Sequence, residues 1–307
     1  MDVRKLKQFV RIAKVLAPEN IAIGSEKCMT LCRGPIEVMA GNENRCDMFL
    51  VTLENLQAAM SSLTKLSKEV EMNYSDGVLQ IGYEGVKETL PAKRVGESVE
   101  SSSNAHHPLF TAYAPLMRWT LAGCAKSASK YDAITPSTSA LRFREVGQML
   151  DVTWCSLDTV VSLRTPAMPH TCLSGTYAIS KENLAKIPAI LGVIRGDSTC
   201  YIRIAVSDAP HVDLMFDDVI IRAEAREESA QLIPFLAPKE GEVYEDDGTG
   251  IYIDAETLGI DEKGAAFIEV AFDDLGCSIE ETRTSVIAHG GADGTELIVA
   301  VAKRKRD

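Results

Sequence analysis

The chain has 307 residues, which is enough for two ordinary domains. Hydrophobic residues make up 46% of it, which is enough for sizeable cores. It has no run of the roughly 18 apolar residues that a membrane-spanning helix needs, and its N-terminus is basic and amphipathic, so we expect a cytoplasmic protein without a membrane segment. The formal net charge of −12 argues at first against a nucleic-acid partner, because phosphate binding requires Lys and Arg.

The first part of the chain, residues 1–94, reads as one helix-and-strand unit. Residues 3–16 are predicted to form a helix that carries a basic stripe beside its apolar face. Short strands are expected next, followed by a helix from Leu53 to about Lys68. Alternating residues on either side of Asp76-Gly77 predict a β-hairpin, and a further strand is expected near Val86–Leu90. Residues 95–108 are rich in serine and are expected to form a linker.

A second unit of the same kind is expected at residues 109–238. It begins with a predicted helix at about 115–130, followed by three strands. Another helix is predicted at about 181–195, although Pro188 should kink or shorten it. A hairpin and one more strand complete the unit, as in the first.

Two matching stretches join these units into a repeat. Val51-Thr52-Leu53-Glu54-Asn55-Leu56 returns 128 positions later as Ile179-Ser180-Lys181-Glu182-Asn183-Leu184. Each stretch has the pattern of a strand end, a hydroxyl cap and a helix start. Similar hydrophobic patterns follow both stretches, so we interpret them as the same position in a duplicated unit.

Residues 239–307 match neither unit as a whole. Their 17 acidic and 7 basic side chains leave a net charge of −10 in this part of the chain. Strands are predicted at Ile251–Ile253, Phe267–Phe272 and Leu297–Val301. The segment is either an acidic, β-rich C-terminal extension or a partial third domain.

The helices carry a charge opposite to that of the whole chain. The four predicted helices hold 13 basic and 3 acidic residues, a net charge of +10, which leaves −22 for the rest. Lys and Arg are also good helix formers on solvated faces, which is the simpler explanation for any single helix. For four helices of one sign in an acidic protein, the pattern favours one phosphate-binding face on a body that otherwise repels DNA.

With two helix-plus-strand half-units per domain, basic helices and a Leu90-Pro91-Ala92 segment closing the first domain, the chain resembles the DNA sliding clamps. These are the ring-shaped processivity factors of replicative polymerases, and the similarity is to the bacterial and phage kinds. It covers residues 1 to about 238. Four segments carry it: Leu6–Leu16, Thr52–Leu90, Leu116–Trp154 and Ile179–Ala223. The resemblance implies an α+β fold, with sheets outside and basic helices lining the hole of the ring.

The resemblance also implies which residues face DNA. The DNA-binding residues would contact backbone phosphates without reading sequence, as sliding requires. They would be Arg4, Lys7, Arg11, Lys14, Lys65, Lys68, Arg118, Lys126, Lys130, Lys181, Lys186 and Arg195.

Rings of this family contain six domains. Two complete domains per chain would give a trimer, whereas a tail that completes a third domain would give a dimer. Because residues 239–307 are shorter than either unit, we expect the trimer. The implied partners are double-stranded DNA and, through short peptides, a DNA polymerase and a clamp loader. The peptide pocket is not placed; the linker 95–108 and Leu232–Leu236 are its expected borders.

Two alternatives stay open from the sequence. A metal-dependent enzyme could use paired carboxylates, although adjacent acids on a strand point to opposite faces. His106-His107 lies in a polar linker and is expected to be exposed rather than a metal site. The carboxylate pairs are Asp217-Asp218, Asp246-Asp247 and Asp273-Asp274. A monomeric, non-ring DNA-binding polymerase accessory would be expected to be basic overall, so the acidic chain favours a ring. The eight scattered cysteines lack Cys-x-x-Cys spacing, and we expect no catalytic residues, metal or cofactor.

Overall fold

A computed structural model describes most of the chain. The described residues are 3–24, 29–40, 47–63, 70–83, 86–97, 109–128, 140–156, 158–167, 173, 175–194, 201–207, 211–216, 219–228, 255–282 and 284–303. No helix in these ranges is long and apolar enough to cross a membrane. The elements follow one another in three groups along the chain.

The first group covers residues 3–97, whose described parts form two helices and eight strands. The helices are α1 (Val3–Leu16) and α2 (Leu53–Leu63). The strands are β1 (Asn20–Gly24), β2 (Met29–Arg33), β3 (Ile36–Ala40), β4 (Asp47–Val51), β5 (Glu71–Ser75), β6 (Val78–Tyr83), β7 (Val86–Pro91) and β8 (Lys93–Glu97). Asp76 and Gly77 both have positive φ angles between β5 and β6, which confirms the predicted hairpin turn. Strand β8 runs past position 94 into the stretch expected to be a linker.

The second group covers residues 109–228. Its helices are α3 (Ala114–Ala128), α4 (Lys181–Leu184) and α5 (Ile187–Leu191). Its strands are β9 (Leu109–Tyr113), β10 (Leu141–Val146), β11 (Met149–Cys155), β12 (Thr159–Pro166), β13 (Thr176–Ile179), β14 (Tyr201–Ser207), β15 (His211–Phe216) and β16 (Val219–Glu228). The single helix predicted at 181–195 is two short helices, because Pro188 occupies the first turn of α5 and cannot continue the hydrogen bonding of α4.

The third group covers residues 255–303 and corrects one expectation. It contains helices α6 (Ala255–Leu258) and α7 (Glu262–Leu275), followed by strands β17 (Ser278–Glu281), β18 (Ser285–Ala292) and β19 (Thr295–Ala302). The strand predicted at Phe267–Phe272 is wrong, because these residues lie within α7, where Ile268 and Ala271 are buried at helical spacing. The described part of this segment is therefore a group of two helices followed by three strands. Ile251–Ile253 lies outside the described residues.

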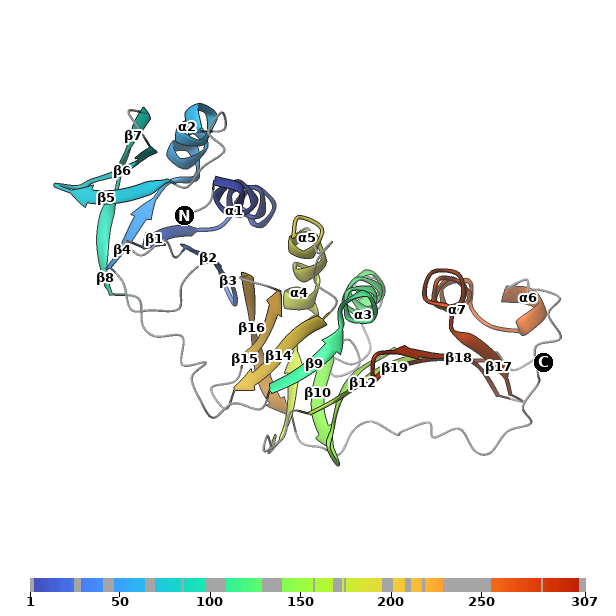
Figure 1. Cartoon of the computed structure of the whole chain (residues 1–307). Helices are drawn as coiled ribbons and strands as arrows, with labels where there is room; N and C mark the ends of the chain where they lie inside the picture. The colour runs from blue at the N-terminus through green and yellow to red at the C-terminus, as the bar shows by residue number, and fades with distance from the viewer. Residues whose placement is uncertain are drawn as a thin grey trace.

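The strands form one long sheet and one small one, and all their pairings in the described residues are antiparallel. Within the described residues the long sheet has 16 strands, and it passes through all three groups. Strand β16 pairs with β3 to join the second group to the first, and β12 pairs with β19 to join it to the third. Figure 1 shows the helices of every group on one side of this curved row of strands. The architecture confirms an α+β fold of repeated helix-plus-antiparallel-strand units.

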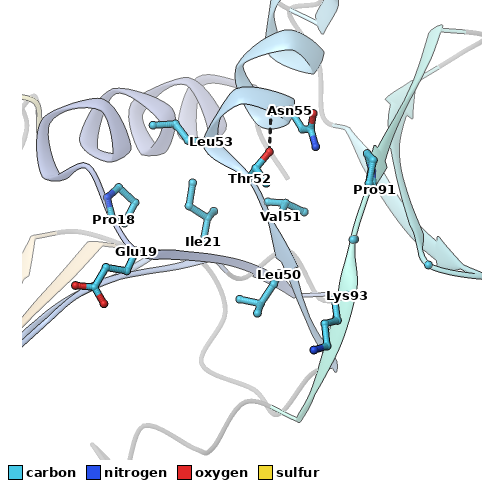
Figure 2. Close-up of a pocket in the computed structure, with 12 residues that line it drawn as sticks. Pro18, Glu19, Ile21, Leu50, Val51, Thr52, Leu53, Asn55, Pro91 and Lys93 are labelled. Carbon is cyan, nitrogen blue, oxygen red and sulfur yellow. Dashed lines mark hydrogen bonds between the residues drawn. The ribbon is translucent and has the colours of Figure 1, made fainter.

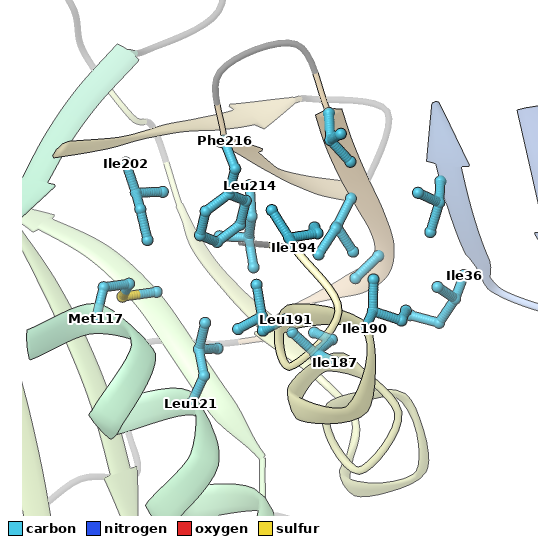
Figure 3. Packing of buried hydrophobic residues seen from close by; sticks show 14 of the residues in the cluster. Ile36, Met117, Leu121, Ile187, Ile190, Leu191, Ile194, Ile202, Leu214 and Phe216 are labelled. Atoms are coloured by element: carbon cyan, nitrogen blue, oxygen red, sulfur yellow. The ribbon is translucent and has the colours of Figure 1, made fainter. Parts of the chain in front are cut away.

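The core lies between the helices and the sheet. In the second group, α5 contributes Ile187, Ile190 and Leu191, which pack among Leu214 and Phe216 of β15 and residues of α3 (Figure 3). Ile36 of β3 lies at the border of this cluster beside α5, so the first and second groups share apolar contacts as well as backbone pairing. Burial of this kind removes apolar surface from water and fixes the helices on one face of the sheet.

Candidate nucleic-acid interface

Helix α1 presents the most basic surface of the described helices. Its buried face includes Leu6, Phe9 and Ile12, which are all under 2% exposed. The helix carries five basic side chains and no acidic one: Arg4, Lys7, Arg11 and Lys14 form a stripe on the opposite face, and Lys5 lies to one side of it. Four of them, Arg4, Lys5, Arg11 and Lys14, are exposed, and Lys7 is half-buried. With a rise of 1.5 Å per residue, the stripe from Arg4 to Lys14 is about 15 Å long, or roughly four base pairs of a duplex.

The carboxyl end of α1 is fixed by an arginine from the sheet. Arg33 Nη1 donates hydrogen bonds to the carbonyl oxygens of Leu16 (2.8 Å) and Ala17 (2.7 Å). These carbonyls have no partner within the helix, and a cation is favoured at the negative end of the helix dipole. The arginine therefore holds α1, and with it the basic stripe, in a defined position on the sheet.

The two matching sequence stretches form the same cap. Thr52 Oγ1 accepts a hydrogen bond from the backbone N–H of Asn55 at 3.2 Å, and Ser180 Oγ accepts one from Asn183 at 3.4 Å. The predicted caps of α2 and α4 are thereby confirmed. Lys181 and Lys186, beside the second cap, are half-buried. Lys65, Lys68 and Arg195 lie outside the described residues.

Helix α3 holds two of the predicted DNA-binding residues in different settings. Lys126 is exposed on the last turn of the helix. Arg118 instead donates hydrogen bonds to the carbonyl oxygens of Leu191 (3.0 Å) and Ile194 (3.3 Å) at the carboxyl end of α5, and its guanidinium lies 5.0 Å from the ring centre of Phe216. These contacts account for Arg118 as a residue that joins α3 to α5. Lys130 lies outside the described residues.

Sequence reasoning missed charged residues at both ends of this row of helices. Lys5 is exposed on α1 but was not among the predicted DNA-binding residues, since it lies one position off the stripe. Helix α7 was not predicted at all, and its exposed side chains include Glu262, Glu269 and Asp273. A helical spacing of acids beside buried Ile268 and Ala271 was the available signal. The helix side of the protein is therefore basic at α1 and acidic at α7.

A hollow of about 570 Å³ lies in the first group, beside the first of the two caps (Figure 2). Ile21, Leu50 and Leu53 form its apolar part, and the charged side chains of Glu19 and Lys93 are exposed at its rim. The borders expected for a partner-peptide pocket are elsewhere: residues 98–108 and 232–236 lie outside the described residues, and 95–97 belong to β8.

The residues proposed for the enzyme alternative do not come together in the described part of the chain. Asp273-Asp274 lies in α7 rather than at a strand end, and Asp217-Asp218, Asp246-Asp247 and His106-His107 fall outside the described residues. No cluster of three or more His, Cys, Asp or Glu side chains suited to a metal occurs among the residues that are described. Cys124 and Cys277 are buried free thiols, and burial raises the pKa of both.

Comparison with known proteins finds similar structures but no similar sequence. A scan against protein-family models finds no match, and a search of curated protein sequences finds no relative. Solved structures do match across the whole chain. The sliding clamp of Pseudomonas aeruginosa bound to griselimycin has a TM-score of 0.61 and 11% sequence identity, covering 99% of this chain and 98% of that chain.

The chain has the DNA sliding-clamp fold. Two further structures agree: the DNA polymerase III beta subunit of Thermotoga maritima has a TM-score of 0.54, 12% identity, and coverage of 100% of this chain and 84% of that one. The Helicobacter pylori beta clamp bound to a DNA ligase peptide has a TM-score of 0.56, 12% identity, and coverage of 99% and 84%. Because these matches extend through the third group, they give no support for a trimer over a dimer. The trimer expectation is therefore not supported; it rested on residues 239–307 being shorter than either unit before them.

Proposed function

We propose that this chain is a subunit of a sliding clamp that encircles double-stranded DNA and tethers a replicative DNA polymerase. The observation that carries the proposal is the basic stripe of α1 on the helix side of a clamp-fold row of strands. The first and second groups would be the domains expected at residues 1–94 and 109–238, with a partial third domain in 239–307. The protein would act by topology rather than by catalysis.

Two copies would close the ring. Three helix-and-sheet groups in each chain supply the six that a clamp ring contains, the third of them being partial. The long sheet ends at β8 in the first group and at β17 in the third, which lie at opposite ends of the row (Figure 1). Exposed edge strands are templates for pairing with another chain. Strand β8 carries exposed Lys93 and Arg94, and β17 carries Glu280 and Glu281, so head-to-tail contact would bring opposite charges together.

The proposed DNA contacts are to phosphate oxygens. Among the predicted residues, Arg4, Lys7, Arg11 and Lys14 share one face of α1, and Lys126 lies on α3. Contacts of this kind ignore sequence and weaken with salt, because each neutralised phosphate releases counterions. A set of exposed, individually weak contacts would allow the ring to move along the duplex. DNA contact by Lys65, Lys68, Lys130, Lys181, Lys186 and Arg195 stays part of the proposal.

The partners would be other replication proteins that carry short peptides. One structural neighbour is a beta clamp bound to a DNA ligase peptide. By analogy, we propose that a polymerase and a clamp loader bind this protein through short segments.

The ring is tested by native mass and by retention on DNA. We expect a mass of two chains, and longer retention on nicked circular DNA than on linear DNA of the same length in a loading-competent assay. A ring slides off free ends, whereas a circle has none. A stable monomer that leaves both DNA forms at the same rate would contradict the ring and favour the monomeric polymerase accessory.

The DNA face is tested by charge reversal. Replacing Arg11, Lys14, Lys126 and Lys130 together with Glu should weaken binding and flatten its salt dependence, by about 0.9 in the logarithmic slope for each phosphate that is no longer neutralised. Lys87→Glu on β7, an exposed cation on a strand, is the control for one charge reversal and is compared with Lys126→Glu alone. Unchanged binding in the quadruple variant, with native mass preserved, would show that these helices do not face DNA.

A further inference from the structure

The exposed charge of the helices changes sign from one end of the chain to the other. Helix α1 carries five cations and no acid. The middle helices carry few exposed charges: Glu54 on α2, Lys126 on α3 and Glu182 on α4. Helix α7 exposes Glu262, Glu269 and Asp273. This gradient does not follow from a uniformly basic lining.

The packing of α7 determines where its acidic side chains point. Phe267 meets Trp119 of α3 edge-to-face, with ring centres 5.8 Å apart, and stacks against Trp154 of β11 at 6.2 Å. Ile268 and Ala271 are fully buried against the core. The acids at positions 262, 269 and 273 are 7 and 4 residues apart, so they form a stripe on the solvent side of the helix. Helix α7 also lies on the same side of the strands as α1 (Figure 1).

We propose that double-stranded DNA contacts this protein unequally, lying against α1 while the acidic face of α7 holds the phosphates off. The inference rests on the proposed function, since it takes DNA to lie on the helix side. Like charges repel over about 8 Å at physiological salt, so phosphates near α7 would be disfavoured while those near α1 are attracted.

Unequal contact would matter for movement along DNA. In a ring of two copies, two α1 helices and two α7 helices would alternate around the hole. The duplex would then contact the basic α1 surfaces, which are separated by the acidic α7 surfaces that repel it. This arrangement lowers the overall affinity for the phosphate backbone. Charge placement on α7 would thus set how strongly the clamp grips DNA.

Neutralising the acids tests the repulsion directly. The full chain carrying Glu262→Gln, Glu269→Gln and Asp273→Asn should bind a 20-base-pair duplex several-fold more tightly than the original at low salt, and the gain should shrink as salt rises. The control is Glu296→Gln, which removes an exposed acid from β19 on the strand side. The control should leave affinity nearly unchanged. A gain per removed acid that is as large in the control as in the triple variant would mean that only net charge matters and would overturn the inference.

Crosslinking locates the duplex independently. A photo-crosslinking residue placed at Gln8 of α1 should capture DNA, whereas one at exposed Ala266 of α7 should capture little until the three acids are neutralised. Equal capture from both positions would overturn the inference.

Ring formation and unequal DNA contact are measured separately. Native mass reports on ring formation, whereas a short duplex can reach the helix side of a single open chain. A monomer that crosslinks to DNA from position 8 and not from 266 would contradict ring formation and support unequal DNA contact. A ring of two chains that crosslinks to DNA equally from both positions, or from neither, would contradict unequal DNA contact and leave the ring supported.

Discussion

Arg222 and Asp213 form a bidentate ion pair beside the pairing of β16 with β3, which joins the first and second groups. Arg222 Nε and Nη2 each donate a hydrogen bond to one carboxylate oxygen of Asp213, both at 2.8 Å. Asp213 is 2% exposed, and Glu37 of β3 lies 3.8 Å from the same guanidinium. The hydrogen bonds to Asp213 raise the pKa of Arg222. One ionic cluster thus ties β15, β16 and β3 together across the groups.

Removing the carboxylate from this cluster should destabilise the protein. Asp213→Ala leaves Arg222 with only the longer contact to Glu37, and breaking a buried pair costs about 3–5 kcal/mol. We expect a lower urea midpoint by circular dichroism. Glu224→Ala, at an exposed position on β16, is the control and should change the midpoint little. Equal midpoints for the two variants would show that the pair adds nothing to stability.

The paired caps should contribute equally to their helices. Thr52→Ala and Ser180→Ala each remove one side-chain acceptor for a backbone N–H, which costs about 1 kcal/mol of stability. Thr52→Ser keeps the acceptor and should restore most of the loss. Thermal unfolding measures all three variants. A Thr52→Ser variant as unstable as Thr52→Ala would indicate that the methyl group, not the hydrogen bond, is what stabilises this site.

Arg118 should behave as a structural residue. Arg118→Gln removes the donors to Leu191 and Ile194 and the contact with Phe216, so we expect a lower melting temperature. The salt-dependent slope of DNA binding should change less than in Lys126→Gln, since the Lys126 side chain is exposed. The reverse order of the two effects would return Arg118 to the phosphate-binding set.

Local chemistry explains which features were predictable from sequence. The caps at Thr52 and Ser180 and the turn at Asp76-Gly77 depend on residues within four positions of each other, and all three were predicted. Tertiary contacts decide the features that were missed. Phe267 lies in a short apolar run that also suits a buried strand, whereas in the structure it is helical and packs against Trp119 and Trp154. The contact of Arg118 with Leu191 joins residues 73 positions apart, and no local pattern indicates it.

The thiol of Cys32 should react slowly in the folded protein. Burial and the nearby carboxylate of Glu37, whose Oε1 lies 3.8 Å from Sγ, raise the pKa of Cys32 to about 11. Compared with an ordinary thiol of pKa 9.0, a pKa of about 11 implies about 100-fold less thiolate at pH 8. Because the unfolded thiol loses its proton first, this group lowers stability as pH rises from about 9 to about 11.

Alkylation followed by mass spectrometry of the Cys32 peptide measures this effect. The rate in the folded chain should rise steadily up to about pH 11, whereas urea-unfolded chain should level off near pH 9. Glu37→Gln removes the neighbouring negative charge and should speed the reaction at pH 8, with burial still slowing it. Identical pH profiles for folded and unfolded chain would contradict the raised pKa.

Helix α7 should tolerate no side chain at Gly264, although alanine is the better helix former. A Cβ at this position would lie 2.4 Å from Cγ1 of Val301 on β19, which is closer than two non-bonded carbon atoms can approach. Alanine gains about 1 kcal/mol of helix propensity, and overpacking a buried site costs about 1–3 kcal/mol, so Gly264→Ala should lower the melting temperature. Adding Val301→Ala to Gly264→Ala removes the clash, and a double-mutant cycle should then give a favourable coupling energy. If Gly264→Ala is as stable as the original chain, α7 packs less closely on β19 than the structure has it.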